Sequence, residues 1–556
     1  MERGDEMVQI ETIWLAVCTA LVFFMQAGFA MLETGFTRRK NACNILMKNI
    51  MDFSIGSLCY WVIGFGIMFG GTTAFAGKLD LFSMQDYAAA GDISQSVFFV
   101  WQLVFCATAT TIVSGAMAER TSFKAYLVYS VIMSAVVYPL SGCWIWNPDG
   151  WLRKMGFHDL AGGTAVHLLG GMTALVGAAV LGARIGKYDA KKKPRVIRGQ
   201  NIPIAALGAF ILWIGWLGFN GGSAVTGYEP FALGEIGHIL KNTLISSAAC
   251  ASAAMFLTWK RYGKSDITMT LNGIVAGLVA ITAGADAVSA IGALIIGIGA
   301  AFVLVFGIEL IENVFKVDDP VGASSVHGLC GGFGTLMVGL FSTKEGVFYT
   351  GRLEFLGVQT LGVISIMAYA ICVMGAVFFI IRKTIGIRVS EEAELKGLDW
   401  SEHGWTIASG SGSIAQDAEI YVPSAGIDLS KKLPEEAYKA DGRMRKVVIV
   451  MNSYRFEALK DALDAIDITG MTVTNVTGCG IQKGNTEYYR GFEEKSHLLP
   501  KIKVEIVICA VPIGLLIDTI KSVLYTGHIG DGKIFVYDVE NVIKVRTNEE
   551  GKLALE

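Results

Sequence analysis

The sequence has few charged residues, few prolines and almost no net charge. Only 17% of its 556 residues are charged, proline occurs 10 times, and the formal net charge is −3. This balance gives no reason to expect a nucleic-acid partner, because such proteins carry a surplus of Lys and Arg. The chain is instead 53% hydrophobic and contains 66 glycines. That composition is typical of a membrane protein whose helices pack closely through glycine.

The ten cysteines form no CxxC pair. Most of them fall in apolar stretches, where a thiol behaves as a small hydrophobic group. We therefore expect no disulfide framework and no zinc site, and no metal or cofactor in the apolar part of the chain. The sequence also lacks a nucleophile–base pattern, so we do not expect an enzyme.

Eleven apolar stretches are long enough to predict membrane-spanning helices, since about 20 residues are needed to cross a bilayer. They are residues 11–36, 50–70, 95–118, 123–143, 161–184, 202–223, 236–258, 268–284, 287–308, 322–341 and 358–383. Lys and Arg gather in the odd-numbered connections, such as Arg38 to Lys48 and Arg184 to Arg198. The positive-inside rule then predicts an inner (plasma) membrane protein with its N-terminus outside and its C-terminus in the cytoplasm.

Two histidines interrupt these apolar stretches in matching contexts. The first reads Asp159-LAGGTAV-His167-LLGG and the second reads Asp319-PVGASSV-His327-GLCGG. Ionisable groups inside a bilayer are costly and usually mark a conduction path or a proton relay. The two histidines fall in the fifth and tenth predicted spans, which run in opposite directions. We therefore predict an inverted repeat of five helices plus one, with both imidazoles near the middle of the membrane.

The composition changes after residue 400. Residues 401–443 are polar and rich in Gly, Ser and Ala, as in a linker. Within residues 444–556, strands are expected at 445–451, 471–478, 503–509 and 533–539, and helices near 456–466 and 513–524. The order βαββαβ predicts an α+β domain of the ferredoxin-like kind. The three predicted parts are a membrane domain at 1–400, the linker, and this cytoplasmic domain.

Several stretches in the apolar part resemble the Amt/Mep/Rh ammonium transporter family. They are GFAMLETGFTRRKN, GAMAER, DLAGGTAVH, GWLGFNGGS, DDPVGASSVHG and GIRVSEEAELKGLDWSEHG. The resemblance implies a homotrimer in membrane lipid, with one ammonium pore in each subunit. It implies roles for seven side chains, which are the pore histidines His167 and His327, the gating rings Phe105 and Phe219, and Trp146, Ser223 and a supporting Asp159 at the recruitment site, to which Phe105 also contributes.

Each of these side chains also has a simpler interpretation. A lone histidine in an apolar span is more often a satisfied core group, and single phenylalanines are usually core packing. Trp146 alone could anchor the membrane interface. Asp159 could cap a helix, because an acid at a helix start accepts its free N–H groups. The duplicated context around the two histidines favours the functional interpretation.

The C-terminal part resembles the PII signal-transduction proteins through MTVTNVTGCGIQKGNTEYYRG and TGHIGDGKIFVYDVENVIKVRT. The resemblance implies a trimer that binds ATP or ADP between subunits, and glycine-rich turns suit phosphate because backbone N–H groups can approach its oxygens. The implied nucleotide contacts are Thr472, Gly478, Gly480, Gly530, Asp531, Gly532, Lys533, Lys544 and Arg546. Gln482 and Lys501 are the implied contacts for Mg²⁺ and 2-oxoglutarate, although Asn452 stands where the family usually carries a basic residue.

Residues 481–498 match the mobile loop of PII proteins, and Arg490 matches the arginine that free PII proteins insert into the pore of a partner transporter. The simpler interpretation is a solvated loop arginine. Because a tether raises the effective concentration of the two parts, we expect an ammonium channel or transporter regulated by its own PII domain. The alternative is an ammonium sensor that transports little and signals through the PII domain to another partner.

Overall fold

The computed structural model describes residues 5–71, 73–226, 235–404, 442–468, 470–478, 486–489, 492–495, 499–525 and 531–555. The chain forms two compact units. The first comprises residues 1–184, 190–194 and 198–390, and the second comprises residues 185–189, 195–197 and 391–556.

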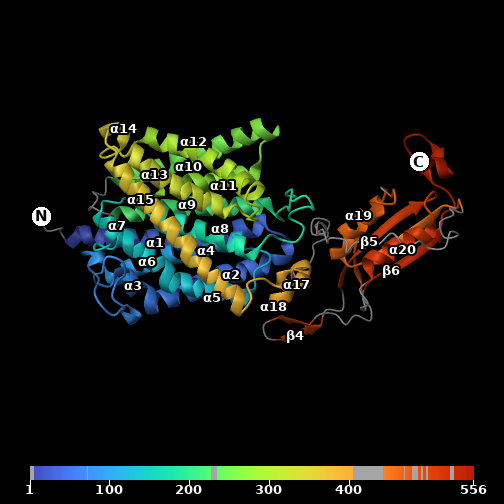
Figure 1. Ribbon diagram of the computed structural model, residues 1–556, viewed down its shortest axis with the longest axis horizontal. Coiled ribbons are helices and arrows are strands. Elements are labelled where there is room, and N and C mark those ends of the chain that lie inside the picture. Colours follow the sequence, from blue (N-terminus) through green and yellow to red (C-terminus); the bar gives the residue numbers. More distant parts are fainter. Residues whose placement is uncertain are drawn as a thin grey trace. The chain divides into compact units, whose positions relative to one another are not determined.

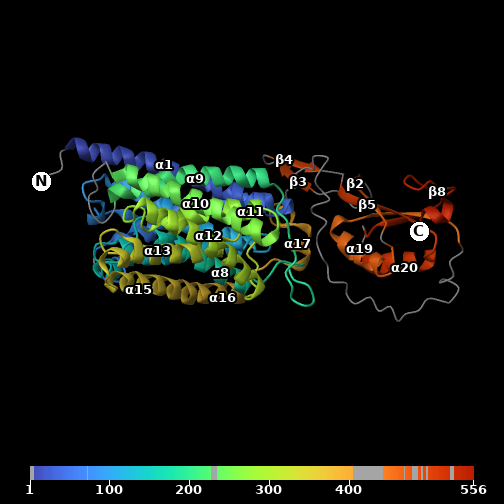
Figure 2. The same cartoon turned by 90° about the horizontal axis from the view of Figure 1, so that it is seen from above.

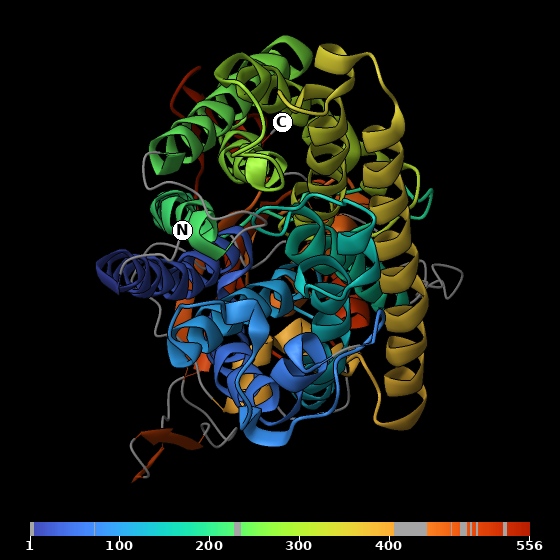
Figure 3. The same ribbon diagram turned by 90° about the vertical axis from the view of Figure 1, so that its left-hand side faces the viewer.

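The first unit is a bundle of helices that run side by side (Figures 1 and 2). The helices are α1 (Asp5–Phe36), α2 (Ala42–Cys59), α3 (Phe65–Phe69), α4 (Gln95–Ala116), α5 (Phe123–Ile132), α6 (Tyr138–Trp146), α7 (Trp151–Lys154), α8 (Leu169–Leu181), α9 (Ile202–Thr226), α10 (Ile236–Tyr262), α11 (Ile267–Thr282), α12 (Ala290–Asn313), α13 (Cys330–Phe341), α14 (Val347–Thr350), α15 (Glu354–Tyr369) and α16 (Gly375–Thr384). A π-helical turn joins α15 to α16, and together they cross one edge of the bundle, as the end-on view in Figure 3 shows.

Among the described residues, ten helices are long and apolar enough to cross a membrane. Ten of the predicted spans correspond to these helices. The eighth predicted span corresponds to α11, which is also apolar but has only 16 residues. The prediction of a helical membrane fold is therefore confirmed, with ten long spans and one shorter apolar helix.

Charged residues from four odd-numbered connections meet in one buried ion-pair network. Glu119 pairs with Arg38 and with Arg184, whose Nη1 lies 2.9 Å from the carboxylate, and Arg184 also pairs with Asp318 at 2.8 Å. Burial alone would raise the pKa of Glu119, but the two guanidinium groups lower it to about 2. The network therefore fastens the first, third, fifth and ninth connections together at one end of the bundle.

The structure corrects the placement of Lys48, which the charge pattern assigned to the first connection. Helix α2 already begins at Ala42, eight residues before the predicted start of the span, so Lys48 lies within the helix. Its side chain is 0% exposed.

The two halves of the unit start their histidine-bearing helices in the same way. His167 lies in the π-helical turn Gly163–Leu168 before α8, and His327 lies in the π-helical turn Ser324–Leu329 before α13. Gly162 and Gly322 precede these turns with φ of 98° and 79°, a backbone conformation that favours glycine. The duplicated sequence thus encodes a duplicated, irregular helix start.

An acidic side chain satisfies the backbone at each of these starts. The Asp159 carboxylate accepts hydrogen bonds from the N–H groups of residues 162, 163, 164 and 165 at 2.7–2.9 Å. The Asp319 carboxylate accepts from Gly322 at 2.9 Å and Ser324 at 2.7 Å. Free N–H groups at a helix start would be costly inside a membrane, where no water is present to bond them.

The glycines that follow the histidines allow α8 and α13 to cross by backbone contact. A Cβ atom on Gly171 would lie 2.0 Å from the backbone nitrogen of Gly328. A Cβ atom on Gly331 would lie 2.6 Å from the carbonyl oxygen of Gly163. Each repeat therefore packs its glycines against the histidine-bearing turn of the other repeat, which fixes the spacing of the two imidazoles.

This crossing predicts the effect of a single methyl group. Gly171→Ala should lower the stability of the unit by about 1–3 kcal/mol or more, since the methyl group meets backbone rather than a movable side chain. The measurement is thermal unfolding of the purified protein in detergent. Gly357→Ala on α15 is the matched control, because no atom lies within 4 Å of that Cβ position. Equal unfolding temperatures for the two variants would contradict the crossing.

The second unit contains a four-stranded antiparallel sheet with the order β2-β5-β1-β6. Its elements are α17 (Glu391–Lys396), α18 (Leu398–His403), β1 (Arg445–Met451), α19 (Phe456–Asp464), β2 (Thr472–Gly478), β3 (Thr486–Tyr489), β4 (Phe492–Lys495), β5 (Leu499–Ile508), α20 (Ile513–Leu524), β6 (Lys533–Asp538), β7 (Ile543–Lys544) and β8 (Glu549–Glu550). Helices α19 and α20 cover one face of the sheet (Figure 2).

The core of this unit lies between the sheet and its two helices. Val447 and Ile449 of β1 are buried, together with Leu459 of α19 and Leu516 of α20. The four strands and two helices of the prediction are all present, although β5 begins at Leu499 rather than 503. The β3–β4 hairpin was not predicted, and the linker residues 405–441 lie outside the described part.

Candidate functional site

The two imidazoles face each other inside the first unit. The Nδ1 atoms of His167 and His327 lie 3.2 Å apart, and the rings are stacked with their centroids 5.2 Å apart. Hydrogen-bond distance between two Nδ1 atoms requires one to donate and the other to accept. The side chains are 0% and 4% exposed, so bulk water does not reach the contact freely.

Aromatic rings continue the line of the histidines in one direction. The rings of Phe105 and Phe219 are stacked at 4.1 Å, and Phe219 lies 5.5 Å from the ring of His167. Trp216 stacks on His167 at 5.0 Å, and its Nε1 donates to Thr282 at 2.9 Å. These rings form an apolar constriction directly next to the first histidine.

At the far side of the constriction lie the residues expected at the recruitment site. The ring of Trp146 meets Phe105 edge-on at 5.9 Å, and its Nε1 donates to the carbonyl oxygen of Asp159 at 2.8 Å. The Ser223 hydroxyl donates to the carbonyl oxygen of Phe219 at 2.9 Å, so its oxygen can still accept. Asp159 therefore acts on this end indirectly, by holding the tryptophan and the start of the helix.

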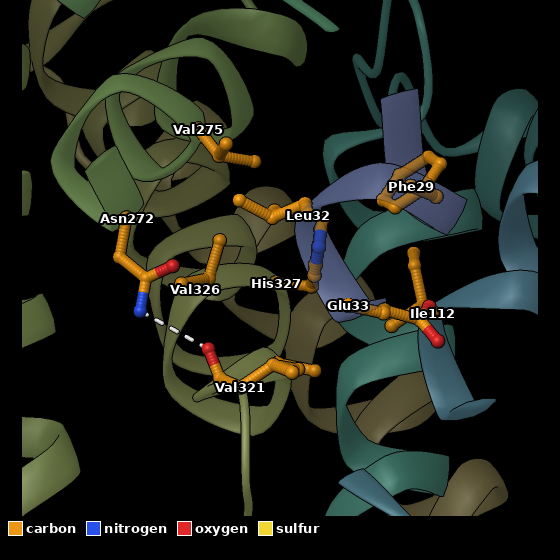
Figure 4. Close-up of a pocket in the computed structure, with 10 residues that line it drawn as sticks. Phe29, Leu32, Glu33, Ile112, Asn272, Val275, Val321, Val326 and His327 are labelled. Carbon is orange, nitrogen blue, oxygen red and sulfur yellow. Dashed lines mark hydrogen bonds between the residues drawn. The ribbon is translucent and has the colours of Figure 1, made fainter. Parts of the chain in front are cut away.

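On the opposite side, His327 opens onto a cavity (Figure 4). The residues around it include Phe29, Leu32, Glu33, Asn272, Val321 and His327. The ring of Phe29 lies 5.9 Å from that of His327, and Asn272 donates to the carbonyl oxygen of Val321 at 3.0 Å. The structure thus brings the predicted pore residues into one column, and this cavity continues the column beyond the second histidine.

Two protein-family models match this sequence. A family model described as Ammonium Transporter Family matches residues 13–407. The chain belongs to the ammonium transporter family. A second model, Nitrogen regulatory protein P-II, matches residues 444–549. The resemblances drawn from the sequence motifs are both confirmed.

The relatives of this family member come from distant organisms. Ammonium transporter Amt2 of Archaeoglobus fulgidus is 43% identical over 416 residues, which cover 71% of this chain and 87% of that protein. Ammonium transporter 1 member 3 of Solanum lycopersicum is 35% identical, with 71% and 92% covered. These relatives are named as transporters rather than enzymes, as the sequence predicted.

Two solved structures have the same fold. One, titled Sensor Amt Protein, is 36% identical with a TM-score of 0.68, and the match covers 72% of this chain and all of that chain. Saccharomyces cerevisiae Mep2 is 25% identical with a TM-score of 0.63, covering 69% and 89%. The matches are confined to about seven-tenths of this chain, in keeping with an additional P-II region here.

The P-II region places its predicted nucleotide contacts at two separate edges. Thr472 and Gly478 begin and end β2, whereas Lys533 begins β6 at the other edge of the sheet. Gly532 has φ of 131°, and a Cβ there would lie 2.6 Å from the carbonyl oxygen of Val450. One copy of the sheet therefore does not bring the two groups together.

Other predicted contacts in this region are also placed. Lys544 lies in β7 with its Nζ 3.3 Å from Glu549, and Arg546 and Asp531 are in connecting segments. Lys501 donates to the side-chain oxygen of Asn452 at 2.6 Å, and burial lowers the pKa of Lys501. Gly480, Gln482, Arg490 and Gly530 lie outside the described residues, and no group of three metal-binding side chains occurs within the described part.

Sequence reasoning missed Trp216 and Glu33. Trp216 stands three residues before Phe219, so both rings fall on the same face of α9. Glu33 is an acid inside a predicted span, and the rule that identified the histidines applies to it equally. Neither residue has a repeated sequence context to draw attention to it.

One more ionisable pair lies just before the π-helical turn that carries His167. The Nε2 of His158 is 3.0 Å from the Asp286 carboxylate, and its backbone N–H donates to Gln359. Burial alone would lower the pKa of His158, but the charge and hydrogen bond of Asp286 raise it above its usual value of about 6.5.

This pair should make stability depend on pH. A raised pKa in the folded state contributes stability below pH ~6.5, which is lost as the pH rises through the folded value. The difference in unfolding temperature between the unaltered protein and His158→Gln should therefore be larger at pH ~5.5 than at pH ~8.5. The unaltered protein should exceed Asp286→Asn in unfolding temperature in the same pH-dependent way, because this variant loses the same ion pair. A gap that does not change with pH would contradict the pairing.

Proposed function

We propose that the first unit conducts ammonium by separating it into ammonia and a proton. Ammonium is held at the outer end by the face of Trp146 and the oxygen of Ser223, a combination that suits a small cation. It loses its proton there, and ammonia passes the Phe105–Phe219 constriction. The proton travels separately along the His167–His327 pair. The 3.2 Å contact between the two Nδ1 atoms is the observation that carries this proposal.

The free-energy costs favour moving ammonia and the proton separately over moving intact ammonium. Moving an intact small ion into an apolar constriction costs roughly 20 kcal/mol before relaxation. Deprotonating ammonium about two pH units below its pKa costs only about 3 kcal/mol. The buried imidazole pair offers the proton polar atoms, and the stacked phenylalanines offer neutral ammonia an apolar passage.

The setting of the pore is part of the same proposal. The membrane domain comprises residues 1–400 with eleven transmembrane helices, counting α11, in an inverted five-helix repeat plus one. Its N-terminus is outside the inner (plasma) membrane, and the protein is a homotrimer. The linker is 401–443, and the ferredoxin-like PII domain at 444–556 is cytoplasmic. The positive charge of the odd-numbered connections supports this orientation.

The histidine pair is tested by measuring current and ammonia flux together. His167→Ala and His327→Ala should each reduce the ammonium-driven current in proteoliposomes at least tenfold, since the proton loses its polar path. His238→Ala is the matched control, because His238 contacts Val288 rather than the column. An unchanged current in either pore variant would refute the relay.

We also propose that the PII domain regulates this pore through ATP or ADP. The opposite placement of Thr472 and Lys533 in one sheet supports a nucleotide site shared between subunits of a trimer. Mg²⁺ and 2-oxoglutarate would bind near Gln482 and Lys501. Lys501 already donates to Asn452, so 2-oxoglutarate would compete with this bond for the Lys501 ammonium group. Arg490 would block the pore in one nucleotide state.

Regulation is tested on the full-length chain. Current measured with ATP, ADP and 2-oxoglutarate in turn should be reduced at least severalfold by one nucleotide. Arg490→Ala should abolish that reduction while nucleotide binding, measured by calorimetry, stays unchanged. Lys533→Gln should instead weaken nucleotide binding, because the point charge on phosphate is lost. Inhibition that persists in Arg490→Ala would exclude the plug.

The second candidate function is an ammonium sensor with little transport. It is supported by the likeness of the membrane unit to the structure titled Sensor Amt Protein. Binding of ammonium without current, together with an ammonium-dependent change in the PII domain, would favour this function. A sustained current would favour the channel.

A further inference from the structure

Three ionisable side chains inside the first unit have no part in the mechanism described so far. Glu33 of α1 is 3% exposed, and Lys48 and Asp52 of α2 are 0% exposed. All three lie in helices that are long and apolar enough to cross a membrane. Ionisable groups at such positions are expensive and commonly belong to proton pathways.

Glu33 is the member of this group that reaches the pore. It lines the same cavity as His327 (Figure 4). It lies four residues, about 6 Å along the helix axis, beyond Phe29, whose ring contacts His327. Lys48 and Asp52 are not among the residues that line the cavity. Glu33 therefore faces the histidine pair from the side away from the phenylalanine constriction.

The surroundings of Glu33 can support a carboxyl group in either protonation state. Asn49 donates its side-chain N–H to Glu33 at 3.3 Å. Its neighbour Lys48 lies over the ring of Tyr126 at 5.1 Å. The charge of Lys48 favours the carboxylate form of Glu33, while the apolar walls of the cavity and the nearby Asp52 carboxyl group favour the neutral acid.

Asp52 differs from Glu33 in a way that separates their roles. Tyr126 and Ser130 each donate a hydroxyl to the Asp52 carboxylate at 2.6 Å. These two short bonds fix Asp52 as an acceptor away from the cavity. Within the group of Glu33, Lys48 and Asp52, the Asp52 carboxyl group is thus held by its hydrogen bonds, and the Glu33 carboxyl group is the one that can exchange a proton with the cavity.

We propose that Glu33 is the proton acceptor on the inner side of the histidine pair. The inference rests on the proposed function. After the proton released by ammonium has reached the imidazoles, the Nε2–H of the His327 imidazolium passes a proton to water in the cavity. That water passes a proton to the Glu33 carboxylate, which becomes a neutral acid. The acid then releases its proton to water on the inner side, and Glu33 returns to its carboxylate form.

Glu33→Gln tests this role, because it keeps the shape and hydrogen-bonding ability of the side chain but removes its exchangeable charge. The expected result in proteoliposomes is at least a tenfold loss of ammonium-driven current, with ammonia flux within about twofold of the unaltered protein. Glu33→Asp should recover part of the current. A purely structural role would lower current and flux together, and that result would overturn the proposal.

Two comparisons separate this proposal from the relay itself. Asp52→Asn is the matched control within the same cluster, and it should leave the ratio of current to flux unchanged. If His327→Ala abolishes the current and Glu33→Gln does not, only the role of Glu33 fails. If His327→Ala keeps its current, the proposed function fails first.

A measurement on the unaltered protein covers the case in which Glu33→Gln does not fold. Infrared difference spectra should show a change in a carboxylic-acid C=O band when ammonium is added. The band should shift in Glu33→Asp and persist in Asp52→Asn. Absence of any such change in the unaltered protein would overturn the proposal, as would a band that persists unshifted in Glu33→Asp.

Discussion

The organisation of the membrane unit depends on one contact, the 3.2 Å approach of the Nδ1 atoms of His167 and His327. Two polar rings are stable in an apolar interior only when they bond to each other or to other polar groups, because each unmade hydrogen bond costs about 1–3 kcal/mol. Their contact in turn requires two separate helices to approach within backbone distance. The glycines at 171 and 331 make that approach feasible, since any larger side chain would meet backbone atoms.

The same requirement explains the irregular helix starts. Turning each histidine toward its partner uses a π-helical turn after a glycine of positive φ, which leaves backbone N–H groups without partners in the helix. Asp159 and Asp319 satisfy these groups. The acids that open the two motifs and the glycines that close them therefore serve the placement of the imidazoles between them. The duplicated sequence records this one packing solution, used twice.

The paired site and the membrane spans were predictable from the sequence, because the motif around each histidine is repeated. The matching contexts of the two histidines indicated a paired site, and apolar length indicated the spans. The number of spans was harder to predict. Helix α11 has 16 residues, which make about 24 Å of helix, whereas the hydrocarbon core of a bilayer is roughly 30 Å thick. The charge pattern misplaces Lys48, because a charged residue usually lies outside a span, whereas its burial within α2 depends on the folded bundle. The sequence of the P-II region predicts its four main strands but not the β3–β4 hairpin, whose two strands are short and polar.

A pore that carries only neutral ammonia must still return a proton to the inner side if charge is to move. An apolar passage offers the proton no group to bond to, so its path needs titratable side chains or water. The histidine pair spans only the middle of the column, and the cavity beyond His327 is lined mainly by apolar side chains. A carboxyl group at Glu33 supplies the next acceptor where those apolar walls would otherwise leave a gap. The charge of the buried Lys48 acts on Glu33 in the opposite sense to these apolar walls, because a cation favours the ionised carboxylate.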